Sequence, residues 1–100
     1  MCRRSPLDRI AGDACVVASE LVTNAVTYAR TPIGLTLRTT GDALRIEVTD
    51  ESSAPPAMAR SSADALGGRG LLMVDQLATT WGSERRGHGK VVWAVIDCNP

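Results

Sequence analysis

The spacing of apolar and polar residues changes along the chain, and each spacing predicts a different element. From Pro6 to Arg30 apolar residues recur at about every 3.6 positions, which is typical of one long amphipathic helix. Its apolar arc consists of Ile10, Ala14, Val17, Leu21, Ala25 and Tyr28. Ser5 is suited to cap this helix and Pro6 to open it, and Pro32 ends it because the residue before a proline avoids helical geometry.

Two alternating segments follow the helix and predict a β-hairpin. Residues 33–38 and 43–50 alternate apolar with polar side chains, and residues 39–42 between them have the composition of a turn. The second segment places three apolar residues on one face: Leu44, Ile46 and Val48.

The second half of the chain opens with a segment that has no period. Residues 51–69 are rich in Ser, Ala, Pro and Gly and predict a loop of a length that is usually functional or mobile. Residues 70–78 then predict a short helix, and residues 79–85 and 91–97 predict a second hairpin around the turn 86–89. This order predicts the α+β class, a two-layer sandwich with helices on one face of a mostly antiparallel mixed sheet.

Length and composition narrow the classes of function. A chain of 100 residues suits a single domain, 1–100. The 11 basic and 11 acidic residues cancel, and aromatic residues make up only 3%, so neither a positive field nor a base-stacking surface for nucleic acid is expected. No apolar run approaches the length that crosses a bilayer, so we expect no membrane segment.

The cysteines and the histidine give little support to a metal site. Cys2, Cys15 and Cys98 are widely spaced, and His88 is the single histidine. The odd number of cysteines suits a reducing cytoplasm. We expect Cys15 to be a small core residue of the first helix.

Two polar residues stand on the first helix where its period calls for apolar ones. Asn24 projects from the middle of the apolar arc, and Glu20 lies at its edge one turn earlier. An inward amide without partners costs about 1–3 kcal/mol, and a buried carboxylate costs more. Either a polar ligand meets both side chains, or Asn24 caps a neighbouring backbone segment while Glu20 is half in solvent.

A glycine-rich segment, residues 67–71, directly precedes the second helix. Glycines let backbone N–H groups approach an anion, and the helix N-terminus favours its negative charge. The alternative is a flexible hinge that caps the helix. The glycine spacing fits neither a Walker loop nor a Rossmann fingerprint.

Asp50 closes the second strand of the first hairpin. Its carboxylate can accept a hydrogen bond from an exocyclic amine such as that of adenine, although an Asp that begins a turn is the simpler interpretation. A hydrolase triad from Ser52 or Ser53 with His88 has no Gly-x-Ser-x-Gly elbow to carry it. With the two polar residues of the first helix, the long loop and the glycine segment, Asp50 completes what a purine nucleotide needs: a metal ligand, an amine acceptor, a cover and a phosphate cradle.

These motifs, in this order, resemble the Bergerat-fold (GHKL) ATP-binding domains over nearly the whole chain. The branch they resemble is that of the anti-sigma-factor serine kinases and related small bacterial ATP-binding regulators. The matching segments are Ser19–Val26 for the N box, Val48–Asp50 with Ser52, Pro55 and Pro56 for the first glycine box, Gly67–Asp75 for the second, and Trp81-Gly82 with Gly89–Trp93 for the closing hairpin.

The resemblance implies a role for each candidate residue. Asn24 would coordinate a Mg²⁺ ion that bridges the phosphates of ATP, Glu20 would be the general base, and Asp50 would bind the adenine amine. Residues 51–69 would form the ATP lid. The phosphate cradle would consist of Gly68, Arg69, Gly70 and Leu71, with the arginine balancing charge.

The resemblance also implies a function and partners. The chain would be a cytoplasmic ATP-dependent serine kinase that phosphorylates an anti-sigma-factor antagonist and also holds a sigma factor. The alternative is a module that sequesters a partner, with nucleotide as a switch or without catalysis. The ATP-binding half of a histidine kinase is a remote third interpretation, because the chain has no dimerisation helix with a phospho-acceptor histidine.

Two departures from the family pattern change what we expect. Family members usually carry a further strand and helix before the N-box helix, and this chain starts too late to supply them. We therefore expect part of the sheet or its helical cover to be exposed, which favours a homodimer, strand exchange or a damaged fold. At Lys90-Val91 the family often has a Thr that bonds the adenine edge through water, and its loss argues against tight nucleotide binding.

Overall fold

The computed structural model describes residues 6–29, 31–52 and 69–98. Within them lie the six elements that the sequence predicts, with ends that differ by at most two residues. In chain order these are α1 (Pro6–Tyr28), β1 (Gly34–Thr40), β2 (Ala43–Asp50), α2 (Arg69–Leu77), β3 (Thr80–Arg86) and β4 (Gly89–Asp97). Most of the expected lid, 51–69, lies outside the described residues.

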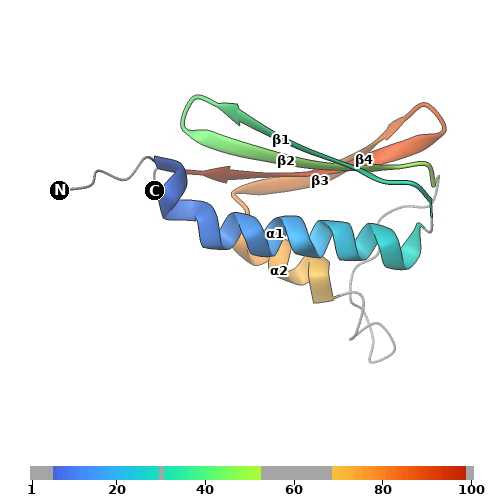
Figure 1. Ribbon diagram of the computed structural model, residues 1–100, viewed down its shortest axis with the longest axis horizontal. Coiled ribbons are helices and arrows are strands. Elements are labelled where there is room, and N and C mark those ends of the chain that lie inside the picture. Colours follow the sequence, from blue (N-terminus) through green and yellow to red (C-terminus); the bar gives the residue numbers. More distant parts are fainter. Residues whose placement is uncertain (1–5, 30, 53–68, 99–100) are drawn as a thin grey trace.

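The four strands form one open sheet in the order β1-β2-β4-β3, and every pairing between them is antiparallel. Both helices lie on the same face of this sheet (Figure 1). The expected α+β class with two layers is therefore confirmed. The central pairing, β2 with β4, brings Asp50 directly opposite Lys90.

The core lies between α1, α2 and the two central strands. Four residues of the apolar arc of α1 are buried as its period predicts: Ile10, Val17, Leu21 and Ala25, with Val17 and Leu21 almost completely enclosed. Each fully buried side chain of this size contributes about 1.5–3 kcal/mol to folding. Ala14 is partly buried, and the side chain of Tyr28 lies outside the described part of the structure. The other buried apolar residues are Leu44, Ile46, Val48, Leu71, Val74, Val91, Val92, Ala94, Ile96 and Cys98.

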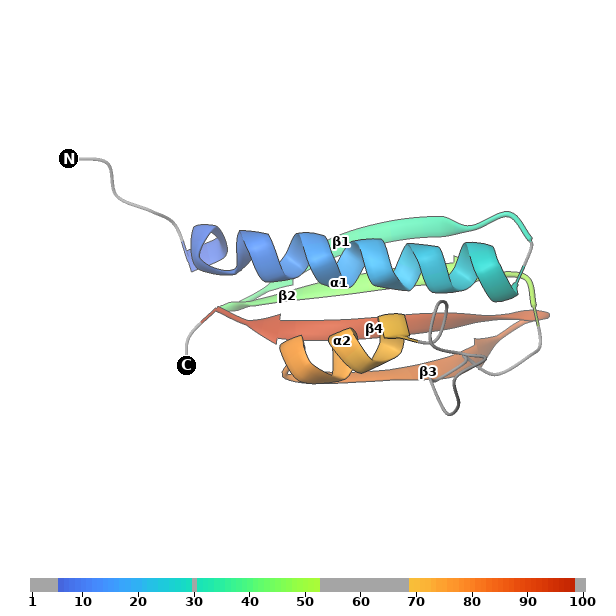
Figure 2. The ribbon, with the colours of Figure 1, turned by 90° about the horizontal axis from the view of Figure 1, so that it is seen from below.

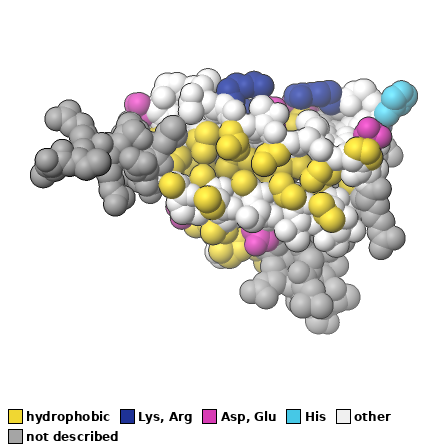
Figure 3. Space-filling model, viewed as in Figure 1, with side chains coloured by type: hydrophobic (Ala, Val, Ile, Leu, Met, Phe, Trp, Pro, Cys, Tyr) yellow, Lys and Arg dark blue, Asp and Glu magenta, His cyan; other side chains and the backbone are white. Residues whose placement is uncertain are grey.

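Strand β1 is an edge strand that the helices leave uncovered. In the register of the sheet Leu35 and Leu37 lie opposite Val48 and Ile46, so they share the face on which the helices pack. They are nevertheless 50% and 58% exposed. Figure 3 shows apolar side chains gathered across the middle of this side of the molecule. The expectation that part of the sheet is exposed is confirmed at β1.

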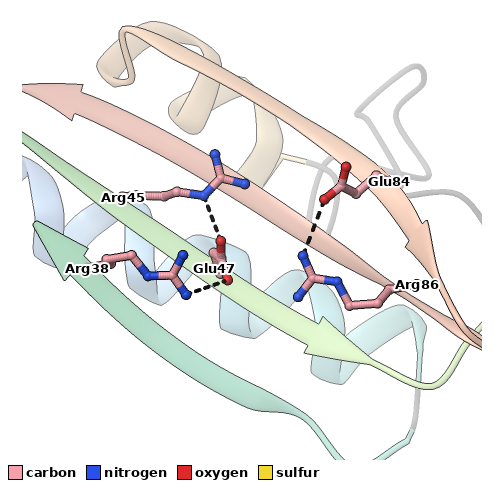
Figure 4. Close-up of polar contacts among 5 residues, drawn as sticks. All are labelled: Arg38, Arg45, Glu47, Glu84 and Arg86. Carbon is pink, nitrogen blue, oxygen red and sulfur yellow. Dashed lines mark hydrogen bonds and ion pairs between the residues drawn. The ribbon is translucent and has the colours of Figure 1, made fainter. Parts of the chain in front are cut away.

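The opposite face of the sheet is polar. Arg45 and Glu47 alternate along β2 with the buried apolar residues, so their side chains lie on the face away from the helices (Figure 4). The guanidinium carbon of Arg45 lies 4.6 Å from the centroid of the Trp93 ring. Long polar side chains and the Trp93 indole thus cover this face, where the charged ends of the side chains can contact solvent.

Cys15 is exposed, so its expected place in the core is wrong. The residue is on α1, but its position on the helical wheel falls outside the arc that contains Val17 and Leu21. Cys98, after β4, is buried instead.

Helix α1 is also long and apolar enough to pass for a membrane span. The window Ile10–Thr27 has a mean hydropathy of 1.2. The expectation that the chain has no membrane segment stays a prediction, because the helix meets this criterion on length and composition alone. These two properties do not separate a spanning helix from a core helix or a signal sequence, and in this structure α1 packs along the sheet.

Candidate functional site

Asn24 points into the protein from the second half of α1. It is 5% exposed and follows the buried Leu21 by one turn. Within the described residues every buried side-chain polar atom has a hydrogen-bond partner, so this amide is satisfied inside the protein. The inward direction predicted from the helical period is confirmed.

Glu20 lies one turn before Asn24 and is half-buried. Residues four apart on a helix lie on the same side of it, so the two polar side chains are neighbours. The carboxylate thus lies where the apolar arc meets solvent, and together with the satisfied amide of Asn24 this also agrees with the alternative in which no ligand meets the two side chains.

Asn24 is suited to bind a magnesium ion only together with the phosphates of a nucleotide. An amide oxygen is an acceptable Mg²⁺ ligand, and this ion is commonly held by one or two protein oxygens together with phosphates and waters. The described residues contain no group of three or more His, Cys, Asp or Glu side chains that could hold a metal. A metal at Asn24 would therefore take most of its ligands from a nucleotide and from water.

Asp50 is held in a closed ion pair by Lys90. The Lys90 Nζ atom lies 3.0 Å from Asp50 Oδ2 and 3.2 Å from Oδ1. The backbone N–H of Ser52 also donates to Oδ1, at 2.8 Å. The side chains of Asp50 and Lys90 are only 1% and 10% exposed. Sequence reasoning placed Asp50 at the strand end but did not predict this partner.

The backbone around Asp50 is packed so closely that only glycine fits opposite it. A Cβ atom added to Gly89 would overlap the carbonyl oxygen of Asp50 and approach the Cα atom of Glu51. The start of β4 therefore lies directly against the end of β2. This close approach fixes the position along the strand pair at which Lys90 meets the Asp50 carboxylate.

The start of α2 carries the predicted phosphate cradle in part. Gly68 lies outside the described residues, while Arg69 and Gly70 are the first two residues of α2. Leu71 follows and is fully buried, which anchors this first turn in the core. Backbone N–H groups in a first turn have no acceptor within the helix, so those of Gly70 and Leu71 are suited to an anion.

A second contact fixes α2 on the sheet. Trp81 Nε1 on β3 donates a hydrogen bond to Asp75 Oδ1 on α2 at 2.8 Å. Val74, one residue earlier, is fully buried. The orientation of the helix, and with it the direction of its N-terminal N–H groups, is thus set from both its apolar and its polar side.

The described parts of the candidate site lie in the same half of the molecule. The N-terminal end of α2 lies beside the middle of α1, and the end of β2 and the start of β4 lie toward the C-terminal end of α1 (Figures 1 and 2). Helices α1 and α2 contact each other. The fold thus places an inward amide, a carboxylate at a strand end and a helix N-terminus in one half of the molecule.

Comparison with known proteins identifies one match. A family model described as histidine kinase-like ATPase domain matches residues 3–96 of the 100-residue chain. That span includes every described element except the last residue of β4. Comparisons with curated proteins and with solved structures found no match.

Proposed function

The chain belongs to the histidine kinase-like ATPase family, of the GHKL type, and from this membership we propose that it is an ATP-dependent protein serine kinase of the anti-sigma-factor type. The family identifies an ATP-binding, kinase-like regulatory domain, and its members generally bind ATP with Mg²⁺. The observation that supports the kinase most is the buried amide of Asn24 one turn after the half-buried carboxylate of Glu20.

Asn24, Asp50 and the start of α2 are the proposed nucleotide-binding groups. The amide oxygen of Asn24 would hold Mg²⁺, and the ion would supply positive charge to the phosphates of ATP. Asp50 accepts from the adenine amine, and backbone N–H groups at Gly70 and Leu71 donate to phosphate oxygens. Gly68 and the guanidinium of Arg69 complete this cradle.

Glu20 is the proposed general base. A serine hydroxyl oxygen of the partner attacks the γ-phosphorus of ATP, the bond from that phosphorus to the β–γ bridging oxygen breaks, and ADP leaves. The hydroxyl proton passes to the Glu20 carboxylate, whose half-buried position leaves it reachable by a partner side chain.

The proposal includes partners and a location. The acceptor serine belongs to an anti-sigma-factor antagonist, a sigma factor is the second protein ligand, and the chain forms a homodimer. The exposed Leu35 and Leu37 on an edge strand support contact with another protein. The unpaired thiols of Cys15 and Cys98 suit a reducing cytoplasm.

Phosphate transfer tests the kinase directly. The chain is incubated with Mg·ATP labelled at the γ-phosphate and with an anti-sigma-factor antagonist, and label on a partner serine is measured. We expect Glu20→Ala to lower transfer by about a hundredfold or more, in the range of general-base removal, while ATP affinity is kept. Equal transfer by Glu20→Ala and the parent would remove Glu20 as the base.

A second candidate function is supported by the ion pair at Asp50. Because Lys90 already holds both oxygens of the carboxylate that would bind adenine, a module that sequesters a partner without using ATP also agrees with the geometry. Titration calorimetry distinguishes the two functions. A well-folded chain that binds the partner but no ATP would favour sequestration.

A further inference from the structure

The ammonium of Lys90 occupies the position that a ligand amine would take at Asp50. Lys90 and Asp50 face each other across β2 and β4, and both carboxylate oxygens lie within hydrogen-bond distance of the ammonium nitrogen, at 3.0 and 3.2 Å. An ammonium and an exocyclic amine are both N–H donors. Lys90 therefore supplies a hydrogen-bond donor from within the protein to the Asp50 carboxylate, which is the group proposed to bind adenine.

The carboxylate has little acceptor capacity left. Two carboxylate oxygens offer about four lone-pair positions. At Oδ1, the N–H of Ser52 and the Lys90 ammonium both donate. At Oδ2 the ammonium donates again. The Asp50 side chain is 1% exposed, so an incoming amine has to displace Lys90 to reach it.

We propose that Lys90 determines the affinity and base specificity of this site by competing, as an intramolecular ligand, with the exocyclic amine of adenine for Asp50. The proposal rests on the proposed function, in which Asp50 binds adenine. Hydrogen bonds between charged partners are about twice as strong as neutral ones. The adenine amine has to replace the ammonium at Asp50, so the affinity for ATP is about tenfold lower with Lys90 present than without it.

This competition predicts different behaviour for two nucleotides that differ only in the exocyclic amine. Only a base that carries an exocyclic amine contends with Lys90 for Asp50. Purine riboside triphosphate has the same phosphates and ring system as ATP but no such amine. It gains nothing from Asp50, whether Lys90 is present or absent.

The test measures the affinity of both nucleotides, with Mg²⁺, for the full chain and for Lys90→Met, which is similar in length and uncharged. We expect ATP to bind the variant about tenfold more tightly and purine riboside triphosphate to bind it as it binds the parent. Lys90→Arg is the matched control, because it keeps a charged donor, and we expect no gain for ATP. Unchanged or weaker ATP binding by Lys90→Met, or an equal gain for both nucleotides, would overturn the proposal.

A folding control keeps the test decisive. Lys90→Met leaves a buried carboxylate without its partner, which destabilises a fold strongly. If circular dichroism shows that this variant does not fold, Asp50→Asn/Lys90→Met replaces it, because its amide oxygen still accepts an amine and no charge is left unpaired. We expect this double variant to bind ATP more tightly than the parent, and equal or weaker binding contradicts the proposal.

Failure of this inference differs from failure of the proposed function. If the parent binds ATP and the folded Lys90 variants bind it no more tightly, the role of Lys90 is rejected and ATP binding stands. If neither the parent nor any folded variant binds either nucleotide, the ATP-binding function is rejected, and the role of Lys90 with it.

Discussion

Arg45 and Glu47 are joined by a hydrogen bond of 2.6 Å from Nε to Oε2, two residues apart on the same face of β2. The Glu47 side chain is only 6% exposed although it lies on the face away from the helices (Figure 4). This hydrogen bond lowers the pKa of Glu47 below its ordinary value of 4.5, against the opposing effect of burial, and the charges of Arg38, Arg45 and Arg86 lower it further.

The lowered pKa predicts that Glu47 stabilises the fold above its ordinary pKa and loses this effect in acid. The unfolded chain binds the proton at a higher pH than the folded chain, so stability falls as the pH drops from 4.5 through the lower pKa of the folded state. Urea unfolding of the parent and of Glu47→Gln should show a difference in unfolding free energy that shrinks across this window. A difference that is constant, or grows toward acid, would contradict the assignment.

Two glycines should respond in opposite ways to the same substitution. Gly89→Ala places a methyl group against the carbonyl of Asp50, and we expect a loss of at least about 1–3 kcal/mol of stability. Gly12→Ala is the matched control, since nothing lies within 4 Å of its added Cβ and it sits inside α1. We expect a gain of about 0.5–1 kcal/mol there. Thermal unfolding of both variants measures the two effects, and changes of the same sign would count against the described packing.

The exposed face of β1 should drive self-association. Leu35→Thr/Leu37→Thr removes two half-exposed apolar side chains and keeps residues that suit a strand. We expect sedimentation equilibrium to show a dimer for the parent and a dissociation constant at least about tenfold higher for the variant. Thr36→Ser, on the other face of β1, is the control and should associate as the parent does. A monomeric parent, or equal association of the variant, would argue against this surface.

Much of the fold could be predicted because its helices and strands follow from the local spacing of apolar and polar residues. Val17, Leu21 and Ala25 of the α1 arc are buried because residues three and four apart share a helix face, which the sequence alone determines. The same period places Asn24 inward. The prediction for Cys15 is wrong because it depends on residue type rather than on the angle of the residue on the helix.

Other features depend on relationships between distant parts of the chain. The ion pair of Asp50 with Lys90 joins residues 40 positions apart and exists because β2 and β4 pair in one particular register. The exposure of Leu37 likewise depends on distant segments, because α1 packs over β2 and β4 while α2 packs against α1 and β3. Neither local propensity nor motif spacing contains this information.

The most direct test of ATP binding at this site is the affinity for ATP, with and without Mg²⁺, of the parent and of Asn24→Ala. Adenosine, which has no phosphates, serves as the control ligand, and circular dichroism verifies the fold. We expect Mg²⁺ to strengthen ATP binding to the parent by at least about tenfold, and Asn24→Ala to lose that gain while its affinity for adenosine is unchanged. If a folded Asn24→Ala keeps the full Mg²⁺-dependent gain, the amide is not a ligand of the metal–nucleotide complex and the central claim is wrong.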